Sequence, residues 1–256
     1  MKLLINKLIS SELLTTIRNT FKVKSVNINK YYSNQNLSIS DAFLFRTNEN
    51  FKTIFRYSDI PKIYHQIQKS EIELIFYNYK NQLIKKIILK DIKKINEIII
   101  DKSFLDNKET FGHFYLFHKI DNLKNEKILL SNRCYLGFSK NNQNPSFVHG
   151  NSFVKGKNFS DDNIISNFVK TSFLKNFDYS IQENFSDYEK IELFIINPTQ
   201  KKVFVTINKK NYILKPDNDI MVNLKSIEKI NIKSNCALLR PVVFTYINDF
   251  MDVHHS

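Results

Sequence analysis

The chain has 256 residues, of which 42% are hydrophobic and 13% aromatic, a composition that excludes a disordered protein and suits one large domain or two ordinary ones. No hydrophobic run approaches the roughly 18 residues of a membrane span, and no leader cleavage site follows the apolar N-terminus, so we expect a cytoplasmic protein. The net charge of +13 comes from lysines placed singly or in pairs, within a bias toward Lys, Asn, Ile and Phe that is typical of an AT-rich genome.

Leucines and isoleucines recur at helical spacing over residues 2–19, which predicts an amphipathic helix. We assign residues 1–37 to this N-terminal helix and a polar linker. From about residue 41 the hydrophobic period changes to two, which is the period of a strand.

Segments of strand length, rich in β-branched and aromatic residues, then follow one another. They cover residues 42–47, 51–57, 71–77, 83–89, 98–100, 114–117, 129–138 and 147–148, with a turn at 78–81. Strands at intervals of roughly ten residues, joined by short polar turns, predict packed antiparallel sheets rather than βαβ units.

The second half of the chain repeats part of this pattern. Residues 190–197 are similar to 70–78, and 203–207 follow as 83–87 do in the first half. Cys134 and Cys236 stand in similar Ser-Asn segments. We therefore predict two tandem antiparallel β-sandwich (jelly-roll-like) domains, at 38–156 and 157–256, and a single elaborated sandwich is the alternative.

This order of strand, turn, strand and Ser-Asn strand resembles the small β-sandwich domains of the sensory-rhodopsin-transducer type, over about residues 71–139 and again 190–244. The resemblance implies a sandwich fold and a ligand-binding or adaptor module, with sugars as candidate ligands. It carries over no catalytic or ligand-binding residue, because no motif that defines such a site is present.

Familiar catalytic motifs are absent from the sequence, including GxGxxG, GxxxxGK[ST], GxSxG and HExxH. Their absence favours a protein that is not an enzyme, although catalytic groups can also converge from distant strands. Both cysteines lie in apolar stretches, which favours buried thiols over a disulfide or a nucleophile.

Arginine is rare here, and a planar guanidinium makes bidentate contacts that lysine cannot make. Arg46, Arg56, Arg133 and Arg240 lie in or beside predicted strands and are candidate ligand-binding residues. The alternative is that each closes a structural ion pair or stacks on an aromatic ring.

All four glycines and three of the six histidines fall within residues 111–156. A long hairpin there would present aromatic and amide groups to a polar ligand such as a sugar. Its candidate residues are Tyr135, Asn142, Asn144, His149 and Asn151. The alternative is that the glycines serve turns and bulges, and that the histidines are ordinary polar groups.

A divalent metal is a further possibility, with His118, His149, Asp252 and His254 as candidate ligands. The alternative is that the C-terminal residues are merely exposed and polar. We expect no other cofactor.

The leading hypothesis is a non-catalytic binding or adaptor protein whose partner is a carbohydrate or another protein. A metal-dependent enzyme acting on glycans is the first alternative. The second is a nucleic-acid-binding protein that uses the basic surface.

Overall fold

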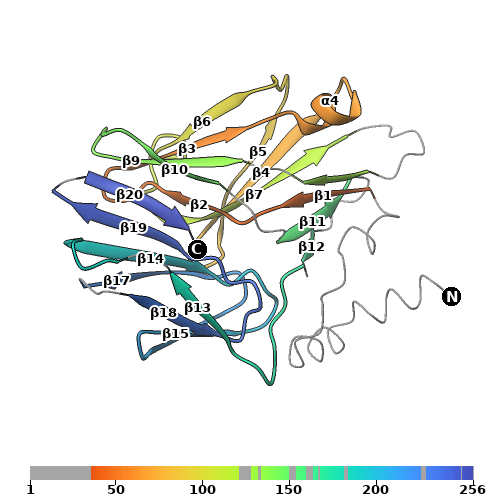
Figure 1. The fold of residues 1–256 in the computed structure, drawn as a ribbon. Coiled ribbons are helices and arrows are strands. Elements are labelled where there is room, and N and C mark those ends of the chain that lie inside the picture. Colours follow the sequence, from red (N-terminus) through yellow and green to blue (C-terminus); the bar gives the residue numbers. More distant parts are fainter. Residues whose placement is uncertain are drawn as a thin grey trace.

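The computed structural model describes residues 36–120, 128–131, 134–149, 154–159, 164–166, 168–181, 184–225, 229–248 and 250–255. These residues form a mainly β protein whose strands gather in four-stranded sheets (Figure 1). The predicted helix over 2–19 and the candidate ligand-binding residues Arg133 and Asn151 lie outside the described residues. No helix in the described part of the chain is long and apolar enough to cross a membrane.

Two antiparallel sheets come from the first half of the chain, and alternation along their strands turns one face of each toward the core. Sheet I contains, in spatial order, β2 (Phe43–Arg46), β7 (Phe111–Lys119), β4 (Glu71–Asn78) and β5 (Leu83–Leu89). Sheet II contains β10 (Ser146–His149), β9 (Tyr135–Lys140), β3 (Phe51–Tyr57) and β6 (Asn96–Ile100).

A third sheet lies beside sheet I and is fastened to it by serine hydroxyls. Sheet III contains β12 (Ile164–Ser166), β11 (Lys155–Asn158), β1 (Leu37–Ser40) and β8 (Leu129–Ser131), with β1 and β8 parallel. The Oγ atoms of Ser38 and Ser40 accept hydrogen bonds of 2.8 Å from the backbone N–H groups of His118 and Leu116 in β7. The helix α4 (Ile60–His65) connects β3 to β4.

Two further sheets come from the second half and lie below sheets I and II in Figure 1. Sheet IV contains β17 (Asp219–Leu224), β14 (Lys190–Ile196), β19 (Val242–Ile247) and β20 (Phe250–His255). Sheet V contains β13 (Phe177–Ile181), β18 (Ile230–Ser234), β15 (Val203–Ile207) and β16 (Lys210–Leu214).

The two halves of the chain share their hydrophobic interior. Sheets I and II bury a cluster rich in phenylalanine, in which the ring centroids of Phe55 and Phe114 are 4.8 Å apart. Sheets IV and V bury a second cluster around Leu193 and Val205. Each cluster also takes side chains from the other half, among them Phe194, Ile196 and Phe244 in the first and Ile75, Tyr115 and Phe117 in the second.

The central strands β4 and β14 are buried on both faces, which explains why their sequences are hydrophobic without a clear alternation. Leu74 and Leu193 each face the cluster of their own half. Their neighbours Ile75 and Phe194 point the opposite way and join the cluster of the other half. The similarity of residues 70–78 to 190–197 therefore reflects a shared environment.

The strands that follow β4 and β14 along the chain do not occupy corresponding places in their sheets. β5 pairs with β4 in sheet I, whereas β15 lies in sheet V and β17 takes the place beside β14. The predicted match of residues 83–87 with 203–207 is thus wrong.

The prediction of buried free thiols is confirmed, because both cysteines are buried and unbridged, and burial raises the pKa of Cys236 to about 11.

One buried ion pair joins the two halves directly. Arg46 in β2 is 1% exposed, and its Nη1 lies 2.6 Å from Oε2 of Glu192 in β14. The Tyr246 hydroxyl donates a 2.5 Å hydrogen bond to the same carboxylate oxygen. The guanidinium carbon lies 3.8 Å from the ring centroid of Phe51 and 4.9 Å from that of Phe244. Both charges are therefore removed from water, and each is paired with the other, while Lys190 forms a second ion pair with Glu192 at 2.8 Å.

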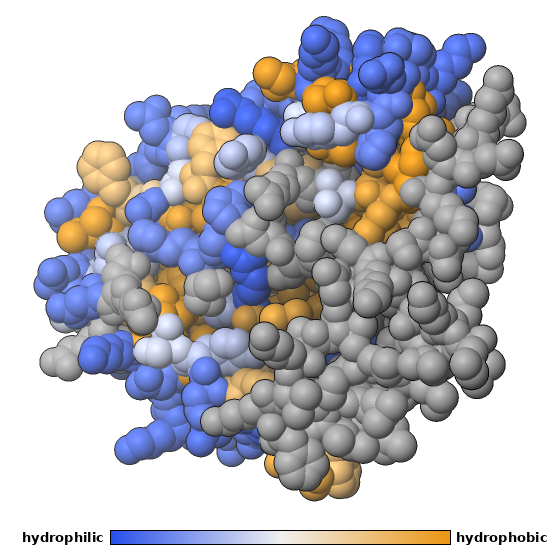
Figure 2. Space-filling view, turned by 45° about the vertical axis from the view of Figure 1, so that its right-hand side comes forward, coloured by the Kyte–Doolittle hydropathy of each residue, from blue (hydrophilic) through white to orange (hydrophobic). Residues whose placement is uncertain are grey.

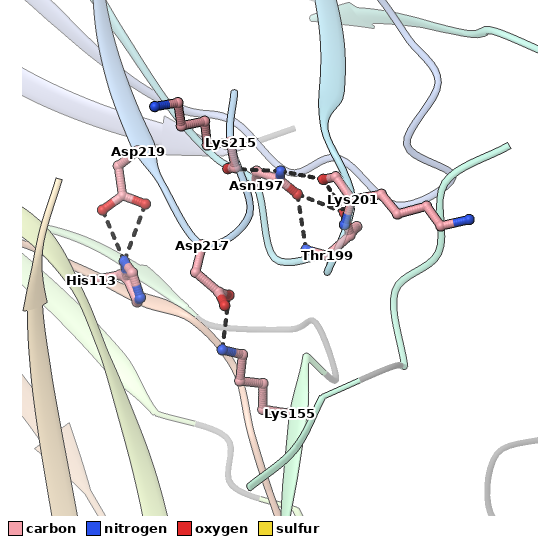
Figure 3. A network of polar contacts seen from close by, with 8 residues as sticks. All are labelled: His113, Lys155, Asn197, Thr199, Lys201, Lys215, Asp217 and Asp219. Atoms are coloured by element: carbon pink, nitrogen blue, oxygen red, sulfur yellow. Dashed lines mark hydrogen bonds and ion pairs between the residues drawn. The ribbon is translucent and has the colours of Figure 1, made fainter. Parts of the chain in front are cut away.

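A second polar network lies where sheet I meets β17, as Figure 3 shows. His113 Nδ1 lies 2.9 Å from Oδ2 of Asp219, and both side chains are fully buried. Lys155 Nζ forms a 2.8 Å ion pair with Asp217 next to it. Burial raises the pKa of Asp219 to about 6, although the neighbouring His113 opposes this shift. The network ties β7 to β17 through Asp219, and it ties β11 to the β16–β17 connection through Asp217.

We predict that Arg46→Met destabilises the protein by about 3–5 kcal/mol, because it leaves the Glu192 carboxylate buried without its main counter-charge. Arg56→Met is the matched control: Arg56 forms an exposed pair with Glu97, and its loss costs less than about 1 kcal/mol. Urea unfolding at neutral pH measures both. Equal effects of the two substitutions would show that the buried pair does not hold the halves together.

The same pair predicts a loss of stability in acid. Burial raises the pKa of Glu192, but the Arg46 charge and hydrogen bonds from Lys190 and Tyr246 outweigh it and lower the pKa from 4.5 to about 2. A depressed carboxylate pKa stabilises the fold above pH 4.5, and this contribution is lost as the pH falls toward 2. The urea midpoint should therefore fall more steeply across this window in wild type than in Glu192→Gln. Parallel curves would contradict the assignment.

Candidate ligand-binding site

A row of polar and aromatic side chains crosses the outer face of sheet II. The strand register places Arg56 of β3 opposite Glu97 of β6 and Tyr135 of β9, and Tyr135 opposite His149 of β10. Directly opposed residues point to the same face of a sheet, and all four are exposed to solvent. We call Glu97, Arg56, Tyr135 and His149 the Arg56 row. It brings together three of the candidate ligand-binding residues.

Two contacts fix the position of the Arg56 guanidinium but leave it accessible to solvent. Its Nε donates a 2.7 Å hydrogen bond to Oε2 of Glu97, and its guanidinium carbon lies 4.6 Å from the ring centroid of Phe147. Both predicted alternatives for a strand arginine, an ion pair and aromatic stacking, are thus present at this residue. Because the pair is exposed to water, it is weak, and a ligand can compete for the guanidinium.

Phe147 lies across the sheet because the residue opposite it has no side chain. Gly137 pairs with Phe147 in the register, and a Cβ atom at Gly137 would come within 2.5 Å of the phenylalanine ring. Gly137 lies inside β9, so it serves close packing rather than a turn. Gly112 likewise lies inside β7, where a Cβ would come within 2.1 Å of the Tyr77 carbonyl oxygen.

The row ends at a small pocket between the two halves. The ring centroids of His149 and His255 are 4.5 Å apart, and Arg240 Nη2 lies 3.0 Å from Nδ1 of His255. A guanidinium can only donate, so Nδ1 of His255 is the acceptor and its proton lies on Nε2. The pocket, which we call the junction pocket, encloses about 60 Å³ and is also lined by Asp41 and Pro198. This volume suits a few waters or one small polar group.

Two ionisable side chains of opposite sign, Arg240 and Asp41, line the junction pocket. Burial lowers the pKa of Arg240, and the Asp41 carboxylate opposes the shift. A guanidinium pKa starts so high that Arg240 stays charged at neutral pH. The pocket therefore contains a fixed positive charge, with an acidic side chain and two imidazole rings beside it.

Other candidate residues lie elsewhere. Arg46 is buried in the ion pair described above and does not reach the outer face. Asn142 lies in the β9–β10 turn with φ at 60°, and its Oδ1 accepts a 2.8 Å hydrogen bond from Lys52 Nζ at the end of sheet II away from the Arg56 row. Asn144 is exposed in the same turn.

The candidate metal ligands are only partly brought together. Asp252 and His254 are neighbours on β20, with 3.4 Å between Oδ2 and Nε2, and Ser146 Oγ donates to Asp252. His149 lies at the junction pocket, while His118 is buried within β7. Among the residues that the structure describes, no three His, Cys, Asp or Glu side chains gather into a metal-binding group.

The pair of His113 and Asp219 has the imidazole–carboxylate arrangement that orients a general base. Both side chains are fully buried beneath Tyr77, whose ring stacks on His113 at a centroid distance of 5.4 Å. A substrate on the surface cannot contact this imidazole, so the pair has a structural role.

Sequence reasoning missed three members of the site. Glu97, Phe147 and His255 are distant in sequence from the residues that they contact. For Phe147 a signal existed, because alternation within β10 places Phe147 and His149 on one face. For Glu97 and His255 only the strand register reveals the contact.

The chain matches no protein-family model and shows no significant sequence similarity to a curated protein. The resemblance to sensory-rhodopsin-transducer-type domains therefore stays a prediction. The geometry of the Arg56 row and the junction pocket is the main basis for a functional conclusion.

We predict that Gly137→Ala displaces the Phe147 ring and destabilises the protein by about 1–3 kcal/mol, because the added methyl group overpacks the contact. In Phe147→Ala the ring is already absent, so adding Gly137→Ala should then cost much less. A double-mutant cycle by urea unfolding measures this coupling. Additive effects would show that the ring does not depend on Gly137.

Proposed function

We propose that the protein is a non-catalytic carbohydrate-binding protein whose ligand lies on the Arg56 row. The observation that carries this proposal is the alignment of an exposed aromatic ring with a cation, an anion and an imidazole on one sheet face. The Tyr135 side chain is 56% exposed and lies directly between Arg56 and His149 in the register.

The chemistry of these groups fits a sugar. Sugar hydroxyls act as donors and acceptors at once, so they need both kinds of partner within a short span. The Arg56 guanidinium donates, the Glu97 carboxylate accepts, and the imidazole of His149 can do either. The Tyr135 and Phe147 rings provide flat apolar surface against which the C–H face of a pyranose can pack.

The site also has two parts that differ in depth. The Arg56 row is exposed to solvent, whereas the junction pocket is small and partly enclosed. His149 belongs to the row and also lines the pocket. A sugar on the row could place one substituent, such as a carboxylate, next to Arg240.

We infer further that the chain is built as two tandem β-sandwiches that share their interface. Three features of β4 and β14 support this. First, Leu74 and Leu193 each face the hydrophobic cluster of their own half. Second, Glu73 and Glu192 are buried acids that are paired with basic residues. Third, Asn78 and Asn197 each accept backbone hydrogen bonds that stabilise the turn that follows. The predicted boundary between residues 156 and 157 falls within β11, a strand that pairs with β1 of the first half in sheet III.

The proposal predicts that Tyr135→Ala weakens sugar binding by at least about tenfold, because a buried aromatic contact is commonly a binding hot spot. Glycan-array screening of the intact protein identifies a ligand, and calorimetric titration measures its affinity for wild type and variant. Tyr64→Ala is the matched control, since Tyr64 is 72% exposed on α4 and lies outside the row. Both tyrosines are exposed, so both variants should fold normally.

Arg56→Met tests the polar half of the same site and should weaken binding without changing the fold. Two results would refute the proposal: no glycan binding by the wild-type protein, or equal affinity in wild type and Tyr135→Ala.

A further inference from the structure

Two large apolar side chains protrude from the loop that precedes β13. Phe173 is 89% exposed and Leu174 is 72% exposed, and they are adjacent in the chain. The loop reaches the lowest point of the molecule in Figure 1, and hydrophobic atoms stand out at the same end in Figure 2. Single exposed apolar residues are ordinary, but two adjacent large ones at a protruding tip indicate a contact surface.

The loop is fixed to the end of sheet V. Thr171 forms an isolated bridge with Cys236, and the Ser172 N–H donates a 2.7 Å hydrogen bond to the Asn235 carbonyl. Ser172 Oγ then accepts from the Lys175 N–H at 3.1 Å, closing a tight turn around Phe173 and Leu174. The backbone on both sides of the tip is thus anchored, and the two side chains are held outward.

A third exposed apolar residue lies on the strand next to this anchor. Asn235 Oδ1 accepts a 2.9 Å hydrogen bond from the N–H of Phe204, whose residue is 51% exposed. Asn235 Nδ2 also reaches the Lys202 carbonyl at 3.5 Å. We call Phe173, Leu174 and Phe204 the apolar tip.

Three described segments beside the apolar tip carry only positive charge. They comprise residues 168–177, 200–205 and 233–237, and they contain no Asp or Glu. Their basic residues are Lys170, Lys175, Lys201, Lys202 and Lys233, whereas Arg240 lies in the junction pocket. The whole chain has 38 basic and 25 acidic residues, so a group of five lysines without any acid departs from its average. Asp178, just outside these segments, pairs with Lys233 at 3.5 Å.

We propose that the apolar tip docks the protein on an anionic lipid bilayer. Phe173 and Leu174 enter the boundary between headgroups and acyl chains, and the surrounding lysines contact lipid phosphates and carboxylates. Charge complementarity identifies the occupant: a protruding apolar tip with lysines beside it matches a deformable surface that is anionic outside and apolar within. Stable attachment to a membrane takes two signals, and this end of the protein supplies both.

This inference is independent of the carbohydrate site. The apolar tip belongs to the loop before β13 and to sheet V, whereas the Arg56 row belongs to sheet II. A protein that binds both ligands would hold a glycan at a membrane surface.

The test is co-sedimentation of the full chain with vesicles of phosphatidylcholine alone and with vesicles that also contain phosphatidylserine. The wild-type protein should bind the phosphatidylserine vesicles at low salt, and binding should weaken as salt is added. Phe173→Ala with Leu174→Ala should reduce the partition coefficient by at least about tenfold, because two apolar side chains no longer insert. Lys170→Glu with Lys175→Glu should reduce it by a similar factor.

Phe250→Ala is the matched control, because Phe250 is 74% exposed on β20 of sheet IV, and it should bind as wild type does. Circular dichroism checks that every variant is folded. The proposal is overturned if wild type does not bind phosphatidylserine vesicles at low salt, or if the tip variant binds equally well. It is also overturned if the tip variant abolishes self-association in analytical ultracentrifugation while vesicle binding persists, since the tip would then be a protein interface.

Discussion

The ion pair between Arg46 and Glu192 is the constraint on which the arrangement of the two halves depends. Removing each charge from water costs several kcal/mol, so the pair is tolerable only when both partners and their hydrogen bonds are in place. Phe51 and Phe244 enclose the guanidinium from different halves of the chain, and Tyr246 completes the coordination of the carboxylate. A relative shift of β2 and β14 would separate the two charges while both remain buried. The desolvation cost would then no longer be offset by pairing, so the halves are restricted to one arrangement.

That arrangement in turn forms the candidate site. Asp41 and His149 of the junction pocket come from the first half, whereas Arg240 and His255 come from the second. Neither half alone could form the pocket. The buried pair of His113 and Asp219 acts in the same way, because it joins β7 to β17. Buried polar groups here select one packing of two hydrophobic surfaces that would otherwise slide over each other.

Strand positions were largely predictable from the sequence because each strand carries its own hydrophobic pattern. The ranges 51–57 and 83–89 match β3 and β5, and the turn at 78–81 lies between β4 and β5. The predicted strand at 129–138 is divided in the structure between β8 and β9, which lie in different sheets. No local pattern encodes which sheet a strand joins, since that depends on pairing between distant segments.

The helix α4 was missed although its start has a recognisable signal. Asp59 Oδ1 accepts a hydrogen bond from the Lys62 N–H, and Pro61 lies in the first turn, where its missing N–H is not needed. The candidate site was predictable only in part for a different reason. Tyr135 and His149 could be placed on one hairpin, but their alignment with Arg56 and Glu97 requires the register of all four strands in sheet II.

Arg46 and Arg56 show why residue type alone could not separate structure from function. Each has a glutamate partner and an aromatic ring beside its guanidinium, so their local chemistry is the same. They differ in solvation. Opening the buried pair would leave Arg46 buried without its main counter-charge, at a cost of about 3–5 kcal/mol, whereas opening the exposed pair costs at most about 1 kcal/mol. A ligand can therefore displace Glu97 from Arg56 with ordinary binding energy, while Glu192 and Arg46 remain paired throughout. Burial, which the sequence does not display, decides which arginine is available.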